Sequence, residues 1–134
     1  MIVVDTNIIS YLFLPTTYTE LAEQLYQRDA NWIAPPLWRS EFRNVLALYL
    51  RKDLIGFEDA LALQEQAELL LAETEMEASS SKILELVNTS QCSAYDCEFV
   101  ALAKDLNLRL VTQDKKMLAQ FPETAKSLQQ VLGV

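Results

Sequence analysis

Hydrophobic and polar positions follow two different patterns along the chain. Short, nearly continuous apolar runs predict buried strands over residues 1–5, 32–34 and 108–112. Apolar residues three and four positions apart predict half-buried helices over residues 6–14, 17–28, 37–52, 57–73, 80–87, 93–106 and 115–120. A brief edge strand is expected at 75–78, and a final helical segment is expected after the break at Pro122. This alternation predicts an α/β fold in which a central parallel sheet lies between two helical layers, in three-layer α/β/α order.

Two of the predicted strands lead into an aspartate, the first into Asp5 and the last into Asp114. The carboxyl ends of neighbouring parallel strands lie at one edge of a sheet, where open α/β sheets place their ligands. Two carboxylates about 4 Å apart repel each other by roughly 4 kcal/mol near a protein surface, so such a pair needs a cationic partner. The sequence therefore favours a divalent metal ion at this edge.

The composition excludes several kinds of catalytic site. The 134-residue chain has the length of one domain, residues 1–134, and it contains no histidine, which excludes Ser-His-Asp catalysis and His-liganded zinc. Its two glycines cannot form the glycine-rich loops that cradle phosphates. Because it has two cysteines and no long apolar run, we expect a cytoplasmic protein without membrane contact. The residue types that remain available, among them carboxylates, are compatible with a site that binds Mg²⁺ or Mn²⁺.

The net charge of −8 is concentrated in one part of the chain. Residues 58–85 contain eight acidic residues and one lysine, whereas the remainder contains ten basic and eleven acidic residues. If four of those eleven acids neutralise a metal ion, ten bases face seven acids there, and a phosphate backbone can approach. The candidate contacts with such a phosphate backbone are Arg39, Arg43, Lys115 and Lys116. An exposed charged face explains these four residues about equally well.

Two further acids complete a set of four. Glu41 lies beside the apolar stripe of its predicted helix, and Asp96 lies in the first turn of another. Four segments that contain these acids resemble the signature segments of PIN-domain ribonucleases, and especially of the VapC-type toxins of prokaryotic toxin-antitoxin pairs. These segments are Val3–Ile8, Ser40–Leu46, Tyr95–Ala103 and Leu110–Asp114. The resemblance spans nearly the whole chain, and the segments occur in the family's order.

This resemblance implies a PIN-like fold with an acidic centre that binds one or two Mg²⁺ or Mn²⁺ ions. The acids implied as metal ligands and catalytic residues are Asp5, Glu41, Asp96 and Asp114. The polar side chains implied to support them are Thr6, Asn7 and Thr112. The resemblance also implies that the chain hydrolyses RNA as an endoribonuclease and is restrained by a VapB-like antitoxin. Met117 occupies a position where some members have a further acid.

The run Ile8–Leu14 is apolar almost all round its predicted helix. A helix without a polar face is usually buried on both sides. We therefore expect this segment to contribute to a homodimer interface.

Most of the four acids also have a structural explanation. Asp5 and Asp114 can each cap the helix that follows, and Asp96 completes an S-x-x-D capping box with Ser93. Glu41 has no such explanation, because the nearby arginines lie two positions away and do not face it on a helix. One shared metal ion accounts for all four acids better than three caps and an unpaired glutamate do.

Two other functions fit parts of the pattern. A non-catalytic PIN-fold module that binds RNA or protein would share the fold, but it would be expected to have lost at least one acid. A phosphatase of the haloacid dehalogenase type also begins with a strand that ends in aspartate. That chemistry needs a second aspartate two residues later, where this chain has Asn7. A metal-dependent ribonuclease is therefore the leading hypothesis, and the binding module is the alternative.

Overall fold

Four short parallel strands form one sheet in the computed structural model, which describes all residues from Met1 to Val134. In spatial order the strands are β2 (Trp32–Ile33), β1 (Ile2–Val4), β3 (Leu110–Val111) and β4 (Ala125–Lys126). All strand residues except Lys126 are buried, which explains why the first three strands read as continuous apolar runs. Since β1 pairs with β3 in parallel, the residues that follow these two strands meet at one edge of the sheet.

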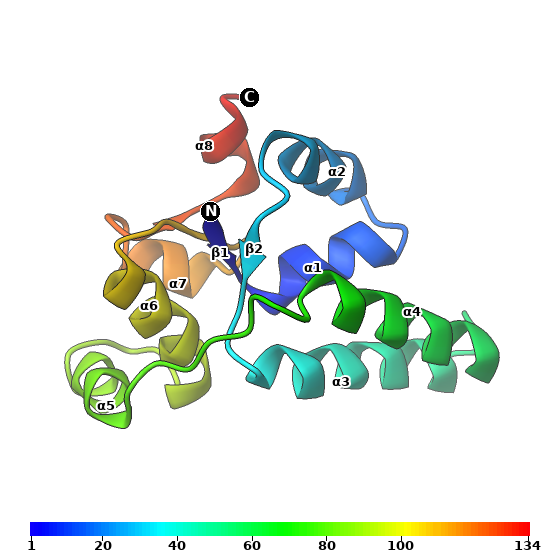
Figure 1. The fold of residues 1–134 in the computed structure, drawn as a ribbon, viewed down its shortest axis with the longest axis horizontal. Helices are drawn as coiled ribbons and strands as arrows, with labels where there is room; N and C mark the ends of the chain where they lie inside the picture. Colours follow the sequence, from blue (N-terminus) through cyan, green and yellow to red (C-terminus); the bar gives the residue numbers. More distant parts are fainter.

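Helices cover both faces of the sheet and complete three layers (Figure 1). One layer contains α1 (Thr6–Phe13), α2 (Thr19–Arg28), α3 (Leu37–Arg51) and α4 (Phe57–Leu70). The other layer contains α5 (Ser80–Asn88), α6 (Ala94–Leu106) and α7 (Lys115–Gln120), and the short α8 (Leu128–Leu132) packs against α2. In Figure 1, α3 and α4 lie side by side and extend away from the sheet. The predicted α/β/α fold with a central parallel sheet is confirmed.

Two predictions at the margins of the sheet need correction. The expected edge strand at 75–78 is reduced to a single bridge between Ala34 and Glu75, so it adds no fifth strand. The segment after Pro122 is not wholly helical, because Ala125–Lys126 pairs with β3 before α8 begins. A two-residue edge strand has no alternating pattern of its own, and its pairing depends on the neighbouring strand.

The apolar run of α1 is explained by packing within this chain. Ile8 and Ile9 are fully buried, and Leu14 directly after the helix is buried as well. Tyr11 and Phe13 are partly buried and pack against the same core. A second copy of the chain is therefore not needed to explain the run, and the expected homodimer loses the observation on which it was based.

No helix of the chain combines the length and the apolar character that crossing a membrane requires.

Candidate active site

The four acids selected from the sequence line a single cavity of about 370 Å³. Asp5 directly follows β1, and Asp114 follows the neighbouring strand β3 and begins α7. Glu41 comes from the second turn of α3, and Asp96 comes from the first turn of α6. The cavity thus lies at the carboxyl edge of the sheet, between elements of both helical layers.

Asp5 is the most deeply buried of the four acids, with 8% of its surface exposed. Its Oδ1 accepts a hydrogen bond of 2.8 Å from the backbone N–H of Thr6, and its Oδ2 accepts one of 2.7 Å from the Thr112 hydroxyl. Burial raises the pKa of Asp5 to about 7, although these two hydrogen bonds oppose the rise. The negative charges of Glu41 and Asp96 raise this pKa further. The charged form of Asp5 is therefore disfavoured, because the protein alone does not fully compensate its charge.

Thr112 and Asn7 connect the ends of the two central strands. The hydroxyl of Thr112, which is fully buried, donates to Asp5 and accepts from the backbone N–H of Asp114 at 3.0 Å. The Asn7 amide nitrogen lies 3.4 Å from both Asp5 Oδ2 and Thr112 Oγ1, and its oxygen accepts from the backbone N–H of Gln113 at 3.4 Å. Both polar residues singled out beside the acids therefore contact Asp5 directly.

Glu41 is half-buried and has one partner within the chain. Its Oε1 accepts a hydrogen bond of 2.6 Å from the hydroxyl of Thr6. Burial raises the pKa of Glu41, the Thr6 hydrogen bond opposes that rise, and the charge of Asp96 adds to it. The third supporting residue expected from the sequence, Thr6, thus orients Glu41 with its hydroxyl and donates its backbone N–H to the capping carboxylate of Asp5.

Asp96 lies within the electrostatic influence of Asp114. Burial raises the pKa of Asp96, and the negative charge of Asp114 adds to the effect, whereas the charge of Lys116 opposes it. The backbone N–H of Asp96 donates to the Ser93 hydroxyl at 3.1 Å, which fixes the first turn of α6. Asp114 Oδ1 accepts from the backbone N–H of Met117 at 2.9 Å and caps α7.

Capping and lining the cavity are compatible roles for the same residues. The side chains of Asp5 and Asp114 do cap the helices that follow, as the structural explanation predicts. A carboxylate has two oxygens and about four acceptor positions, so one capping bond leaves capacity for other ligands. The caps fix where each carboxylate points, and the fold brings the four of them to one cavity.

Residues 2–125 of the chain match the PIN domain family. The chain belongs to the PIN domain family. Among proteins similar to it, Ribonuclease VapC3 from Pyrobaculum aerophilum is 28% identical, over 90% of this chain and 95% of that protein.

Solved structures with a similar fold come from other organisms. The structure of FitAcB from Neisseria gonorrhoeae aligns with a TM-score of 0.74 and 19% identity, over 96% of this chain and 98% of that chain. A toxin-antitoxin complex from Klebsiella pneumoniae aligns with a TM-score of 0.67 and 18% identity, over 96% of this chain and 98% of that chain. At these identities the two alignments support the PIN fold.

The residues around the PIN cavity fit a hard divalent cation by their chemistry. Four carboxylates supply the oxygen ligands that Mg²⁺ and Mn²⁺ prefer, and burial together with mutual repulsion raises the pKa of three of them, Asp5, Glu41 and Asp96. No group of three or more acidic or cysteine side chains is, however, already arranged as a metal-binding cluster. The donor set is therefore suitable, but its carboxylates would have to draw closer around an ion.

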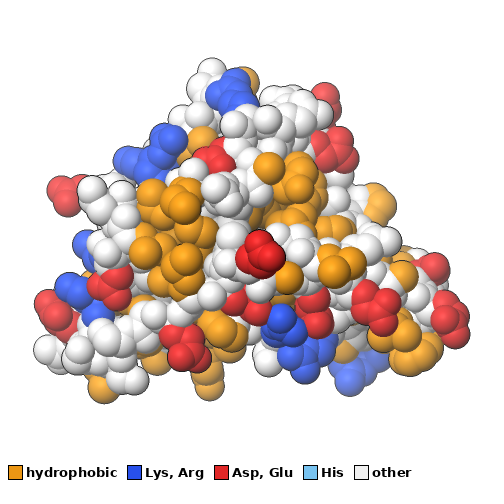
Figure 2. Space-filling model, viewed as in Figure 1, with side chains coloured by type: hydrophobic (Ala, Val, Ile, Leu, Met, Phe, Trp, Pro, Cys, Tyr) orange, Lys and Arg blue, Asp and Glu red, His pale blue; other side chains and the backbone are white.

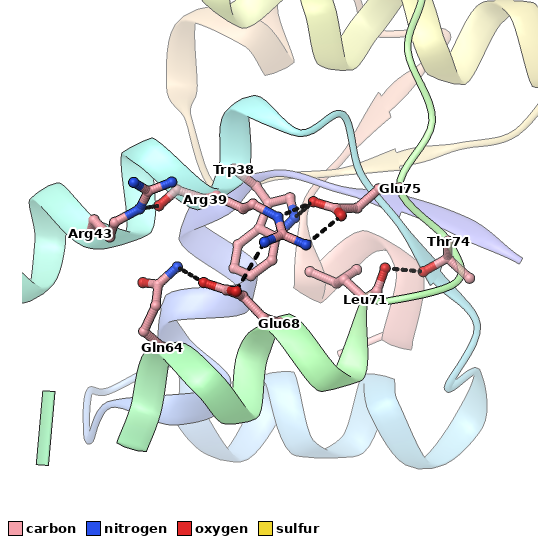
Figure 3. Close-up of polar contacts among 8 residues, drawn as sticks. All are labelled: Trp38, Arg39, Arg43, Gln64, Glu68, Leu71, Thr74 and Glu75. Carbon is pink, nitrogen blue, oxygen red and sulfur yellow. Dashed lines mark hydrogen bonds and ion pairs between the residues drawn. The ribbon is translucent and has the colours of Figure 1, made fainter. Parts of the chain in front are cut away.

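Arg39, a candidate RNA contact, is instead held within the protein, as Figure 3 shows. Its Nε and Nη2 donate to the two carboxylate oxygens of Glu75, each at 2.7 Å, and its Nη1 donates to Glu68 at 2.9 Å. Trp38 Nε1 donates to Glu75 at 2.8 Å. These bonds use three of the five N–H donors of the guanidinium and pair its charge with two carboxylates, which argues against the predicted contact between Arg39 and RNA.

The other three candidate RNA contacts are exposed. Arg43 uses its Nε to donate to the backbone oxygen of Arg39 at 3.1 Å and makes no ion pair. Lys115 and Lys116 lie in the first turn of α7, directly after Asp114, and the charge of Lys116 reaches Asp96. Figure 2 shows acidic side chains along α4 with Lys and Arg side chains beside them at α3, so acidic and basic groups are neighbours on this face.

Several residues of the cavity were not selected from the sequence. Val45 and Tyr49 fit the apolar stripe of α3, and the sequence pattern places them in the core. They are only half-buried, because with Glu41 they form a row at four-residue spacing that lines the cavity. Ser10 and Tyr11 of α1 also line it. The four-residue spacing from Glu41 is the sequence signal that could have identified Val45 and Tyr49.

Proposed function

We propose that this PIN-domain chain is a Mg²⁺- or Mn²⁺-dependent endoribonuclease that hydrolyses RNA phosphodiester bonds. The observation that carries the proposal is the convergence of Asp5, Glu41, Asp96 and Asp114 on one cavity. The similarity to a protein named Ribonuclease VapC3 supports it. We further propose that the chain is the toxin of a VapBC-type pair, with a VapB-like antitoxin as its partner, because a toxin-antitoxin complex is among the solved structures that share its fold.

The four carboxylates would hold the cation, and polar neighbours would orient them. When bound, one or two such ions would activate the attacking water and neutralise charge on the phosphodiester. The hydroxyl of Thr112 holds the carboxylate of Asp5, and the hydroxyl of Thr6 holds that of Glu41. Such hydrogen bonds fix the direction of the remaining lone pairs, which is the usual role of polar groups behind metal ligands.

The chain also contributes a positive charge near the four carboxylates and an apolar wall on one side of the cavity. Lys116 lies close enough to Asp96 to offset part of the negative charge there, and it is exposed, so it can contact an RNA phosphate. Half-buried Tyr49 and Val45 form an apolar wall of the cavity. An apolar wall strengthens the attraction between the carboxylates and a cation, because it lowers the local dielectric constant. None of these contributions requires an imidazole acid or base, which agrees with the absence of histidine from the chain.

The proposal is tested by cleavage of single-stranded RNA with purified protein in Mn²⁺, in Mg²⁺ and in excess EDTA. We expect cleavage with either ion, none in EDTA, and loss of more than about hundred-fold in rate for Asp96→Asn. Asp105→Asn is the matched control, because it makes the same substitution at an exposed position of the same helix. Cleavage by Asp96→Asn at the wild-type rate would contradict the site assignment.

Titration calorimetry with Mn²⁺ separates the enzyme from the non-catalytic module. A saturable heat that is present in the wild type and absent in Asp96→Asn supports the metal site. Metal binding without cleavage of any RNA would favour the binding module instead. The expected homodimer stays a prediction, which light scattering on the purified protein measures directly.

A further inference from the structure

A second cavity of about 320 Å³ adjoins the acidic one and shares Glu41 with it. Its other lining residues are Leu37, Ser40, Asn44 and Tyr95. A volume of this size lies at the lower end of the range for ligand pockets. It therefore suits one small ring system rather than an extended ligand.

The second cavity is formed between two helices of opposite layers. Its α3 side consists of residues at positions 37, 40, 41 and 44, a spacing that places them in one row along a single face of the helix. Its other side is Tyr95, in the first turn of α6 and directly before Asp96. A group that enters this cavity is therefore next to the carboxylate of Glu41, which also lines the acidic cavity.

Tyr95 lies in the first turn of α6 with 63% of its surface accessible. Four aromatic pairs occur in the chain, and Tyr95 belongs to none of them. Its phenol makes no hydrogen bond within the protein. Packing of the folded chain therefore does not explain why an aromatic ring occupies this position.

The opposite wall offers unused polar groups. Ser40 and Asn44 are exposed, and neither side chain forms a hydrogen bond within the chain. The Asn44 amide supplies both donors and an acceptor, and the Ser40 hydroxyl can do either. The cavity thus combines a flat aromatic surface, the aliphatic side chain of Leu37 and polar groups that are free to bind a ligand edge.

We propose that this second cavity binds one nucleobase of single-stranded RNA, next to the phosphodiester held at the acidic cavity. The inference rests on the proposed ribonuclease function and assigns a substrate subsite to it. Tyr95 stacks on the face of the base, and Asn44 and Ser40 bind its polar edge. Bases of single-stranded RNA are commonly recognised in this way, because their faces and edges are both accessible.

The test measures binding of 5′-labelled RNA octamers, oligo(A) and oligo(U), by fluorescence anisotropy with Mn²⁺. It uses the Asp114→Asn protein, in which we expect no cleavage, so that the RNA stays intact. In this background we compare Tyr95→Ala and Tyr95→Phe. Phe57→Ala is the matched control, because Phe57 is similarly exposed, at 68%, but begins α4 and does not line either cavity. An octamer of abasic spacers carries the phosphates without bases.

We expect Tyr95→Ala to weaken binding of the RNA octamers roughly five-fold to hundred-fold, the range for losing one stacked base. Tyr95→Phe keeps the ring and should bind within about two-fold of its parent, as should Phe57→Ala. The abasic octamer should bind every variant equally, a result that damage to the fold or to charge would not produce. Unchanged RNA binding by Tyr95→Ala, or an equal loss of abasic binding, would overturn the inference.

Cleavage by the protein with an intact acidic centre keeps this inference separate from the proposed function. If the wild type cleaves RNA and Tyr95→Ala has the same KM, the subsite is wrong and the ribonuclease stands. If the wild type cleaves no RNA but binding of the RNA octamers still depends on Tyr95, the base-binding site stands and the hydrolase proposal fails. A protein that neither cleaves nor binds the octamers contradicts both.

Discussion

The hydroxyl of Thr112 donates a hydrogen bond of 2.7 Å to Oδ2 of Asp5, and it joins the ends of β3 and β1, which are 107 positions apart in the sequence at these two residues. Both residues are buried, and the same hydroxyl accepts from the backbone N–H of Asp114. One side chain therefore holds the positions of two of the four acids. Its removal should affect both stability and the ionisation of Asp5.

We expect Thr112→Val to lower the free energy of unfolding by about 2 kcal/mol, the usual contribution of a buried hydrogen bond to a charged group. Urea denaturation measures this loss. The variant should also raise the pKa of Asp5 further, because the Thr112 hydrogen bond lowers it in the wild type. Thr112→Ser keeps the hydroxyl and should leave that pKa unchanged, although loss of the buried methyl group costs about 1 kcal/mol of stability. Equal Asp5 pKa values in the two variants would contradict this role.

The raised pKa of Asp5 predicts how stability depends on pH without metal. Between its ordinary value of 3.8 and about 7, the folded protein keeps a proton on Asp5 that the unfolded chain has released. The folded state then binds more protons, so the free energy of unfolding falls as pH rises through this interval, by at most about 1.4 kcal/mol per pH unit. This part of the slope should be absent in Asp5→Asn. We would measure both proteins in EDTA by urea denaturation from pH 4 to pH 8, where identical slopes would exclude the effect.

Much of the acidic centre could be predicted from the sequence, because its chemistry follows strand order. An aspartate that closely follows a buried parallel strand lies at the carboxyl edge of the sheet, and this places Asp5 and Asp114 at the same edge. Asp96 and Glu41 required the resemblance to the PIN domain family, since periodicity alone does not indicate which layer a helix joins. Their placement around one cavity is now observed, whereas their roles stay predictions.

The contacts missed from the sequence depend on segments without a clear pattern. Glu75 lies in the irregular stretch between α4 and α5, and nothing in its spacing indicates that it pairs with Arg39 on α3. Strand β4 was missed for a similar reason, since Ala125–Lys126 is a strand only through its pairing with β3. The spacing of Tyr95 from Phe99 and Leu102 predicts that it belongs to the core face of its helix, whereas the structure shows its ring exposed.

Arg39 should be important for stability rather than for RNA binding. Arg39→Ala would leave Glu75, whose side chain is 16% exposed, without its two strongest hydrogen bonds. We expect a loss of about 2 kcal/mol in urea denaturation and an unchanged KM for RNA. Arg43→Ala, on the same helix, should stay within about 0.5 kcal/mol of the wild type. A variant Arg39→Ala with normal stability and weaker RNA binding would restore the interpretation based on the sequence.

The same ion pair predicts sensitivity to acid. The hydrogen bonds from Arg39 lower the pKa of Glu75 below its ordinary value of 4.5. A lowered carboxyl pKa contributes stability that is complete above the ordinary pKa and is lost as pH falls through the lower, folded value. The stability difference between the wild type and Glu75→Gln should therefore shrink as pH falls below about 4. Urea denaturation of both proteins at pH 3 and pH 6 measures this difference, and a constant value would contradict it.

Ser93 and Ser127 each cap a helix, and replacing them separates a loss of stability from a displacement of Asp96. Ser93 caps α6 by accepting from the backbone N–H of Asp96 at 3.1 Å, and Ser127 caps α8 by accepting from Gln130 at 3.1 Å. Replacing either serine with alanine should cost about 1 kcal/mol in urea denaturation, because each helix loses one side-chain cap. Only Ser93→Ala should also reduce Mn²⁺-dependent RNA cleavage, since α8 contributes no residue to the acidic cavity. Equal losses of cleavage in both variants would mean that general destabilisation, and not the position of Asp96, limits the reaction.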